Sequence, residues 1–391
     1  MKVLFIANSY YMKGNGLAGS ARRTVRKLKE AGIDVRVLSQ ANPEKDGEQP
    51  DYVLKDFHFP VFQKLIDKQG YSFSKTDKAL LREAIRWADV IHLEEPFPLQ
   101  ITAIKIAEEE HKPITGTYHL HPENIFASIG LVKSHFFNGM TMRIWRNAIF
   151  NHCKIVQCPT SNVKERLVKW KFKSDLRVIS NGLVMEDLLT KSDEDSYKKL
   201  GKAKYNVITI GRYSNEKDLE TLLNAMKYSK YNQDIQLIFA GKGPKRNALE
   251  KLALKYYKNG VLPHYPIFGF YSLAELQKLS VQADLYIHCA FVEVEGLSCM
   301  EAIQVGIVPI IAKGELTATS QFALSDKSIF KAKDPRDLAS KIDYWLDNDE
   351  LRKEEAKKYI GLGNRYNIDH SIRELIKMFE DAIEMNGGEA E

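Results

Sequence analysis

The sequence predicts an α/β protein with two doubly wound domains, each a parallel sheet covered by helices on both faces. Three observations predict this class. Short apolar strands alternate with segments of helical spacing in both halves of the chain, as in parallel-sheet proteins. A polar stretch of linker composition, 190–205, separates the two halves. The length of 391 residues suits two domains of ordinary size. We predict domains over 1–185 and 186–365.

The first half begins with an apolar strand at the very start of the chain. The predicted elements, in order, are strand 2–7, helix 18–31, strand 34–39, helix 78–87, strand 89–93, helix 100–109 and strand 113–119. Strands and helices alternate, so this half is expected to form the first parallel sheet.

The second half repeats the pattern and is followed by one more helix. Its predicted elements are strand 206–211, helix 218–227, strand 235–241, helix 245–257, strand 266–269, helix 273–281, strand 284–290, helix 298–305 and strand 307–312. Near the C-terminus, apolar residues fall on one helical face; they are Ile372, Leu375, Ile376, Phe379 and Ile383. This helix follows the complete second sheet, so 366–391 is expected to pack back on the first domain.

The bulk composition excludes several classes of protein. No apolar run reaches the roughly 18 residues that span a bilayer, and no signal-peptide pattern opens the chain. We therefore expect a cytoplasmic protein. The four cysteines lack metal-binding spacing and are expected to be reduced and mostly buried. Charge is uneven: residues 1–185 hold 28 Lys and Arg against 19 Asp and Glu, and the remainder 29 against 32.

The glycine run GNGLAG, Gly14–Gly19, has the spacing of a dinucleotide-binding fingerprint. Such a site also needs glycines directly after the first strand and an acidic residue about 20 positions later. Here several residues separate the strand from Gly14, and the second strand ends in Ser39-Gln40. A nicotinamide or flavin site is therefore disfavoured. An anion-binding loop before a helix and a flexible loop without ligand remain open.

The most informative segment is 291–312, FVEVEGLSCMEAIQVGIVPIIA. It places Glu293 in a loop after a strand, then Gly296, then a helix that carries Glu301. A tight turn at Gly296 leaves the amides of Leu297 and Ser298 unpaired at a helix start, which is a cradle for a diphosphate. Glu293 is expected to face a sugar and Glu301 a ribose. Two solvated carboxylates are the competing interpretation.

Two cations in the second half support a diphosphate site. Arg212 follows the first strand of that half in GRYSNEK, and Lys217 lies at the next helix start. Loops at the carboxyl ends of parallel strands meet at one edge of the sheet, so these cations suit a ligand bound there.

These motifs together resemble glycosyltransferase family 4, retaining enzymes of the GT-B fold, in which two Rossmann-like domains face a cleft. The resemblance rests on Glu293-x7-Glu301, GRYSNEK and FAGKGP, and covers nearly the whole chain. Segments IHLEEPFP and GTYHLH are similar to cleft segments of phosphatidylinositol mannosyltransferases and diacylglycerol glucosyltransferases. The chain departs from the family pattern at Glu295, where an aromatic residue is usual, and this puts the identity of the donor sugar in doubt.

The resemblance assigns roles to individual residues. It implies catalytic roles for Glu293, His119, Arg212 and Lys217, of which the two cations contact the phosphates. The role of the second histidine, His121, stays open. The implied donor-binding residues are Gly16, Gly269, Phe270, Gly296, Leu297, Ser298 and Glu301. The donor is a nucleoside-diphosphate sugar, with UDP expected and no cofactor or metal. The expected mechanism is front-face transfer, in which the leaving phosphate takes the acceptor's proton.

The segment 131–154 interleaves basic and aromatic residues at helical spacing, as in helices that bind anionic membranes. The predicted membrane or acceptor contacts are Lys133, Phe136, Phe137, Arg143, Trp145 and Arg146. A core helix with a solvated basic face is the competing interpretation, and nucleic acid is disfavoured. We expect a hexosyltransferase peripheral to the inner face of the plasma membrane, with a lipid or lipid-linked acceptor. A nucleotide-sugar epimerase and a non-enzymatic nucleotide-sugar-binding protein are the alternatives.

Overall fold

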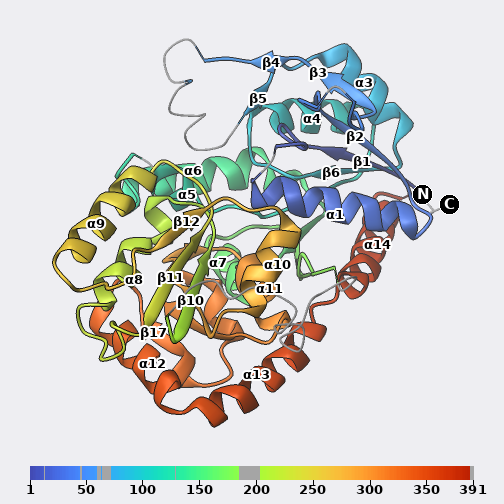
Figure 1. The fold of residues 1–391 in the computed structure, drawn as a ribbon. Coiled ribbons are helices and arrows are strands. Elements are labelled where there is room, and N and C mark those ends of the chain that lie inside the picture. The colour runs from blue at the N-terminus through green and yellow to red at the C-terminus, as the bar shows by residue number, and fades with distance from the viewer. Residues whose placement is uncertain are drawn as a thin grey trace. The chain divides into compact units, whose positions relative to one another are not determined.

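A computed structural model of the chain describes residues 1–12, 14–44, 46–59, 63, 72–127, 129–184 and 203–387. The chain divides into two compact units (Figure 1). The first unit comprises Met1–Phe126, Gly130–Val184 and Ile368–Glu391, and the second comprises Ala127–Ile129 and Met185–Asn367. The predicted boundary between 185 and 186 and most of the predicted linker lie outside the described residues.

The first unit is built on a seven-stranded parallel sheet with the order β3-β2-β1-β6-β7-β8-β9. The order reverses between β1 and β6, and such switch points are where open α/β sheets place their ligands, beyond the carboxyl ends of the strands. Its strands are β1 (Lys2–Ile6), β2 (Asp34–Gln40), β3 (Tyr52–Leu54), β6 (Val90–Leu93), β7 (Ile114–Thr117), β8 (Ile155–Cys158) and β9 (Asp175–Val178). A short antiparallel pair, β4 (Asp56–Phe57) with β5 (Phe73–Ser74), lies apart from this sheet.

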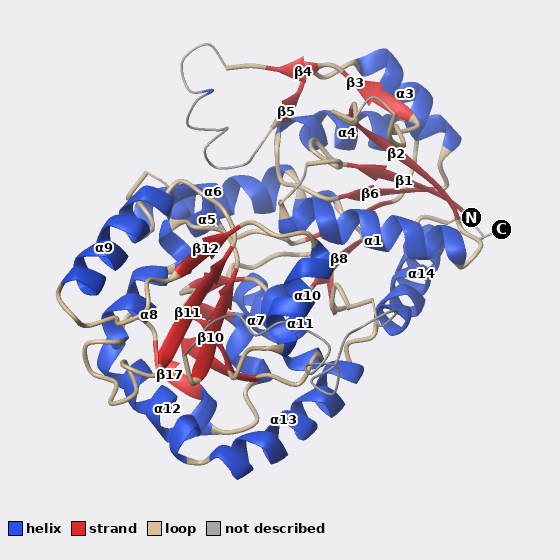
Figure 2. Ribbon diagram, in the orientation of Figure 1, coloured by secondary structure: helices blue, strands red, loops and turns tan. Residues whose placement is uncertain are grey.

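Helices cover this sheet, and one of them comes from the far end of the chain (Figure 2). The helices are α1 (Gly16–Glu30), α3 (Lys78–Trp87), α4 (Pro98–Glu109), α5 (Pro122–Ala127), α6 (His135–Ala148), α7 (Ser161–Lys169) and α14 (Ile368–Glu384). The buried face of α14 joins the core formed by β1, β2 and α1. The ring of Phe379 meets that of Phe5 edge-on at 6.3 Å. The C-terminal helix therefore completes the hydrophobic core of the first unit.

The second unit has a six-stranded parallel sheet with the order β12-β11-β10-β13-β15-β17. Its strands are β10 (Tyr205–Ile210), β11 (Ile235–Ala240), β12 (Ile267–Gly269), β13 (Leu285–His288), β15 (Val308–Lys313) and β17 (Ile329–Lys331). A parallel pair, β14 (Val292–Glu293) with β16 (Leu316–Thr317), is separate from it. The helices are α8 (Leu219–Ala225), α9 (Arg246–Lys258), α10 (Leu273–Val281), α11 (Leu297–Gln304), α12 (Pro335–Asp347) and α13 (Asp349–Asn364). The order reverses between β10 and β13, so the loops after these strands mark the expected ligand edge.

The predicted α/β class with two parallel sheets is confirmed. The strand predicted over 113–119 is shorter in the structure. Strand β7 ends at Thr117, and Tyr118 and His119 lie in the loop beyond it. The sequence had not predicted strands β3, β8, β9 and β17 of the two main sheets, nor helices α5, α7, α12 and α13. All four cysteines are buried and free. Among the described helices, none is long and apolar enough to cross a bilayer.

Candidate active site

The second unit places two of the predicted residues in contact at the carboxyl edge of its sheet. Glu293 ends the short strand β14, and Lys217 ends a one-turn 3-10 helix, Asn215–Lys217, that follows β10. The Lys217 ammonium forms an ion pair with the Glu293 carboxylate. Both side chains are mostly shielded from water, with 22% and 17% of their surface exposed. The residue predicted to bind phosphate and the residue predicted to bind sugar therefore neutralise each other here.

A chain of buried polar side chains continues from Glu293 toward helix α11. The His288 Nε2 atom lies 3.5 Å from the Glu293 carboxylate. The His288 Nδ1 atom is 2.9 Å from the Tyr286 hydroxyl, which lies 2.9 Å from the hydroxyl of Ser298. Thr319 Oγ1 is 3.3 Å from His288 Nε2. The network thus joins the end of β13 to the first turn of α11.

The surroundings of these groups set their charge. Burial opposes ionisation of Glu293, but Lys217 and His288 outweigh it and lower the pKa of this carboxyl to about 2. Burial would lower the pKa of Lys217, but the carboxylate beside it raises it above its usual value. Burial lowers the pKa of His288, so its imidazole is neutral at pH 7. Glu293 is therefore an anion held by one cation and one neutral ring.

Helix α11 begins as the sequence predicts, with a glycine that no other residue could replace easily. Gly296 is its N-cap and has a positive φ of 92°. A Cβ atom there would also lie 2.4 Å from Thr319 Oγ1. No described residue accepts a hydrogen bond from the amides of Leu297 and Ser298. Because helix N-termini attract anions, this turn has the chemistry of a phosphate site, with Glu301 further along the same helix.

The remaining predicted residues of this unit lie in loops at the same edge of the sheet. Arg212 follows β10, one residue after Gly211, and is half-buried. Gly269 ends β12, and a Cβ atom there would lie 2.3 Å from the ring of Tyr271. Phe270 is 53% exposed, and the ammonium of Lys242 lies 4.2 Å from its ring centre. An exposed aromatic ring in this loop can stack on a planar base.

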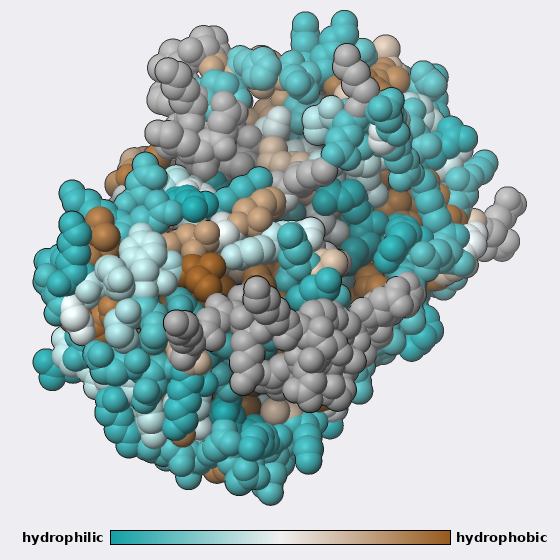
Figure 3. All heavy atoms as spheres, in the orientation of Figure 1, coloured by the Kyte–Doolittle hydropathy of each residue, from teal (hydrophilic) through white to brown (hydrophobic). Residues whose placement is uncertain are grey.

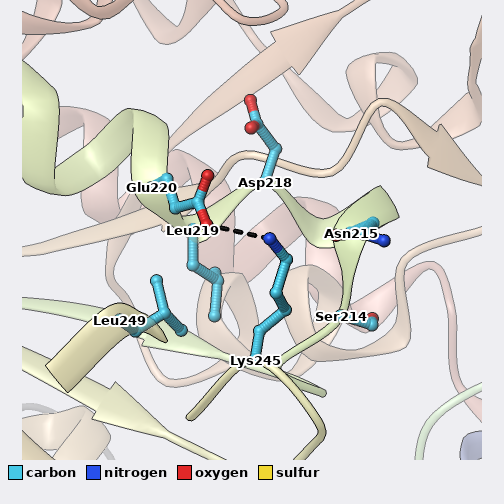
Figure 4. Close-up of a pocket in the computed structure, with 7 residues that line it drawn as sticks. All are labelled: Ser214, Asn215, Asp218, Leu219, Glu220, Lys245 and Leu249. Carbon is cyan, nitrogen blue, oxygen red and sulfur yellow. Dashed lines mark hydrogen bonds and ion pairs between the residues drawn. The ribbon is translucent and has the colours of Figure 1, made fainter. Parts of the chain in front are cut away.

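A small pocket lies beside the Lys217 loop (Figure 4). Its volume is about 20 Å³, which is enough for about one water molecule. The ammonium of Lys245 points toward Glu220 across it, at 3.0 Å. The pocket is lined by Ser214, Asn215, Asp218, Leu219, Glu220, Lys245 and Leu249. It is too small for a sugar or a nucleotide, so it is not itself the donor site.

In the first unit, the glycine run leads directly into a helix. Helix α1 begins at Gly16, and the Asn15 side chain caps it by accepting from the amides of Leu17 and Ala18. A Cβ atom on Gly16 would meet no atom within 4 Å. The packing described here therefore does not explain why a glycine stands at this position.

His119 lies just beyond the end of β7, and its partner is an acid that the sequence had not singled out. His119 Nε2 is 2.8 Å from Glu94 Oε2. Glu94 follows β6, as does Glu95, which accepts hydrogen bonds from the backbone and side-chain nitrogens of Asn8 at 2.7 and 2.6 Å. His121, whose role had stayed open, is fully buried with its Nδ1 atom 3.3 Å from the Tyr118 hydroxyl. The switch point between β1 and β6 is therefore lined by carboxylates and a histidine.

Helix α6 carries most of the predicted membrane contacts, and one of them has to be corrected. Trp145 is 5% exposed and belongs to the core side of the helix, because it packs toward the Tyr118 ring. Arg146 donates to the backbone oxygen of Trp170, so part of its hydrogen-bonding capacity is used within the protein. The opposite side of α6 exposes Phe136 (72%), Phe137 (37%), Met140 (40%) and Ile144 (50%), with Lys133 and Arg143 also exposed.

Several residues of these sites had not been predicted. In the second unit they are Tyr286, His288 and Thr319. In the first they are Glu94 and His92, whose Nε2 atom lies 3.5 Å from the Glu94 carboxylate. A histidine inside the apolar strand 284–290 was the available signal for His288. Most of the molecular face shown in Figure 3 is hydrophilic, with scattered hydrophobic residues. No group of three or more His, Cys, Asp or Glu side chains among the described residues is arranged to hold a metal ion.

Comparison with known proteins assigns this architecture. A model of glycosyl transferases group 1 matches residues 191–359, and a model of Glycosyltransferase Family 4 matches residues 14–187. The chain belongs to the family 4 glycosyltransferases. The two matches divide the enzyme at nearly the same place as the two compact units.

The relatives of this glycosyltransferase have low sequence identity to it, but the similarity extends over most of the chain. It is 24% identical to an alpha-monoglucosyldiacylglycerol synthase of Streptococcus pneumoniae, over 80% of this chain and 71% of that protein. It is 21% identical to the enzyme of the same name from Acholeplasma laidlawii, over 80% of each chain. The crystal structure of Anabaena HepE in complex with UDP and glucose superposes with a TM-score of 0.77 at 16% identity, covering 97% of this chain and 100% of that one. This last likeness establishes the GT-B fold.

Proposed function

We propose that this glycosyltransferase moves a hexose from a UDP-sugar to a lipid or lipid-linked acceptor, with retention of configuration and without a metal ion. The observation that carries the proposal is the cluster of Lys217, Glu293 and the uncapped start of α11. It combines a cation, a carboxylate and free amides at one sheet edge. These are the groups that a diphosphate and a sugar require.

The division of labour follows from the chemistry of each group. The amides of Leu297 and Ser298 and the cations of Arg212 and Lys217 would hold the diphosphate and stabilise the charge that develops when the sugar departs. Glu293, kept ionised, would accept hydrogen bonds from sugar hydroxyls. In this arrangement Lys217 has to exchange the carboxylate of Glu293 for a phosphate oxygen when the donor binds.

In the first unit, His119 would contact a hydroxyl of the sugar or of the acceptor. Gly16 would lie near the donor phosphates, which would account for a glycine at a position where the protein's own packing needs none. The name of the synthases that the chain resembles supports glucose as the sugar and a glycolipid as the acceptor. The UDP and glucose bound in the Anabaena structure support a UDP-sugar donor.

The exposed side of α6 is proposed to dock on an anionic membrane, at the inner face of the plasma membrane. Four apolar side chains beside two cations fit an interface of acyl chains and acidic headgroups. Each cation close to such a surface contributes about 1 kcal/mol. Trp145, being buried, is not part of this surface.

The test begins with calorimetric titration of the protein with UDP, GDP, NAD and a panel of UDP-sugars. Binding of UDP and one UDP-sugar without NAD is expected, followed by transfer to diacylglycerol-containing vesicles with retention shown by NMR of the product. Binding of NAD, or of no nucleotide, would overturn the proposal. Turnover of the UDP-sugar to its epimer without an acceptor would indicate an epimerase instead.

Vesicle flotation tests the membrane surface separately. Replacing Lys133 and Arg143 together with Gln is expected to weaken binding to phosphatidylglycerol vesicles about tenfold or more, from two lost contributions of about 1 kcal/mol, with little change on phosphatidylcholine. The control is Lys251→Gln with Lys255→Gln on α9, which removes the same charge elsewhere. Equal losses in the two double variants would show that only net charge matters and would refute docking through α6.

A further inference from the structure

Glu94 lies between two histidines at the carboxyl edge of the first sheet. Its Oε2 atom is 2.8 Å from His119 Nε2, and its Oε1 atom is 3.5 Å from His92 Nε2. The side chain of Glu94 is 3% exposed. Each oxygen of one buried carboxylate therefore faces the nitrogen of a different imidazole ring.

A chain of hydrogen bonds places a hydrogen on Nε2 of His92, whose Nδ1 atom lies 2.9 Å from the Thr115 hydroxyl. Gln157 donates through Nε2 to the backbone oxygen of Ile179 at 3.0 Å, so its Oε1 atom is the acceptor for the Thr117 hydroxyl at 2.6 Å. The hydroxyl hydrogen of Thr117 is used in that bond. Its oxygen therefore accepts from His92 Nε2, which lies 2.9 Å away. Nε2 of His92 carries a hydrogen, and this hydrogen also faces Glu94.

The charge of Glu94 then decides the state of His119. Burial opposes ionisation, but the two histidines outweigh it and lower the pKa of Glu94 to about 2. An ionised carboxylate can only accept hydrogen bonds. The Nε2 atom of His119 must therefore donate. In a neutral imidazole the other nitrogen then has a lone pair and no hydrogen.

We propose that Glu94 is a positioning residue that fixes His119 with its hydrogen on Nε2, so that Nδ1 accepts a hydrogen bond from a substrate hydroxyl. No described residue other than Glu94 hydrogen-bonds to the His119 ring. The inference rests on the proposed function for its substrate, a sugar or acceptor hydroxyl at His119. Such a site selects a group that donates, and it disfavours an ether or deoxy analogue that leaves Nδ1 unpaired.

The Glu94→Gln variant tests this logic because an amide has one accepting and one donating end. The hydrogen on His92 Nε2, which is bonded to Thr117, also faces position 94 and would repel an amide NH₂ group there, so the amide oxygen turns toward His92. The amide NH₂ group then faces His119 Nε2, which must accept. The hydrogen of His119 is expected to move to Nδ1, and the lone pair at Nδ1 is lost.

The measurement is ¹⁵N NMR of the full-length protein labelled at the imidazole nitrogens, without substrate, at pH values where His119 is neutral. The His119 signals are assigned by their loss in His119→Gln. The wild-type ring is expected to show the Nε2–H tautomer, and Glu94→Gln the Nδ1–H tautomer. Glu95→Gln is the matched control: the neighbouring carboxyl is equally buried but bonds to Asn8, so its variant should keep the wild-type tautomer.

Kinetics provide the second measurement. Glu94→Gln is expected to lower kcat at least about tenfold, as for other residues that orient a reacting histidine, with the affinity for UDP unchanged. Glu94→Asp, which restores an ionised acceptor, should recover part of the lost rate. Equal losses in the Gln and Asp variants would indicate a merely structural role and would overturn the proposal.

The outcomes separate this inference from the proposed function. An Nδ1–H tautomer in the wild type, or an unchanged tautomer in Glu94→Gln, would overturn the role of Glu94 even if sugar transfer is observed. If the Gln variant does not fold, Thr117→Val is the substitute. It removes the hydroxyl that accepts from His92 Nε2, and the change in His92 should broaden or shift the His119 signals. The predicted tautomers without any UDP-sugar binding would leave Glu94 as the residue that orients His119 and would refute the proposed function.

Discussion

The two units each bury an ionised carboxylate next to a histidine, but the two carboxylates are held in different ways. Glu94 is enclosed by two imidazole rings and its side chain is 3% exposed. Glu293 is held by the Lys217 ammonium and the His288 ring, and its side chain is 17% exposed. The first arrangement leaves Glu94 no access to substrate, so it can only support a neighbour. In the second, both Lys217 and Glu293 are proposed substrate contacts, so their pair has to open.

The largest expected effect tests whether the Lys217–Glu293 pair has to open. Glu293→Gln is expected to lower sugar transfer at least about 100-fold, the size of a lost transition-state contact, while UDP binds equally well or more tightly because Lys217 is freed. Steady-state kinetics and calorimetric titration with UDP measure the two effects.

Lys217→Met is the companion variant, and it should weaken UDP binding as well as transfer. Unchanged turnover in Glu293→Gln would refute its assignment. A loss of UDP affinity as large as the loss of rate would show that the ion pair itself builds the phosphate site.

Acid unfolding compares the two carboxylates as structural elements. Each has a pKa near 2 in the folded protein against an ordinary 4.5, so each contributes stability that is fully present above about pH 4.5 and is lost as the pH falls toward 2. The loss is on the order of 3 kcal/mol for each group, from the pKa difference. Urea unfolding between pH 6 and pH 3 measures the part of this loss that occurs above pH 3, and Glu94→Gln and Glu293→Gln should each reduce the pH dependence. An unaltered slope in either variant would show that its carboxylate is not paired as described.

Glu95 is expected to change the stability of the fold with a pH dependence opposite to that of Glu94. Burial raises the pKa of Glu95 to about 7, despite its hydrogen bonds from Asn8. The folded state therefore binds more protons than the unfolded state, and stability is lost as the pH rises from about 4.5 to 7. Glu95→Gln, which imitates the protonated acid, should raise Tm by a few degrees at pH 8 and have little effect at pH 5. A lower Tm at pH 8 would contradict this direction.

Much of the fold could be predicted from the sequence because its strands and helices carry strong local patterns. The α3 and α10 helices have the predicted bounds, 78–87 and 273–281, and each starts directly after a side-chain N-cap, Asp77 or Ser272. Strand β9, DLRV, escaped prediction because charged residues interrupt its apolar pattern. It forms only because it pairs with β8 at the edge of the sheet.

The candidate site was predictable where a motif binds through its backbone, and less so where side chains from separate segments meet. The glycine turn at Gly296 follows from local geometry, because a positive φ and the lack of space beside Thr319 both require glycine. The network of Tyr286, His288, Ser298 and Thr319 depends on three segments that only the folded sheet brings together. Trp145 was wrongly predicted to be a membrane contact, because helical spacing alone did not reveal which side of α6 faces the core.

The C-terminal helix α14 also affects how this enzyme is made. Its residue Phe379 packs against both Phe5 and His92, with ring centres 6.3 and 5.4 Å apart. On the ribosome, every residue of the second unit is synthesised before α14 emerges, while the core of the first unit stays open. The strand β1, which is synthesised first, therefore cannot complete its packing until α14 has been synthesised. The His92 ring beside Glu94 likewise contacts Phe379 only after residue 379 has been added. The edge of the first sheet that carries Glu94 can therefore be completed only after the whole second unit has been synthesised.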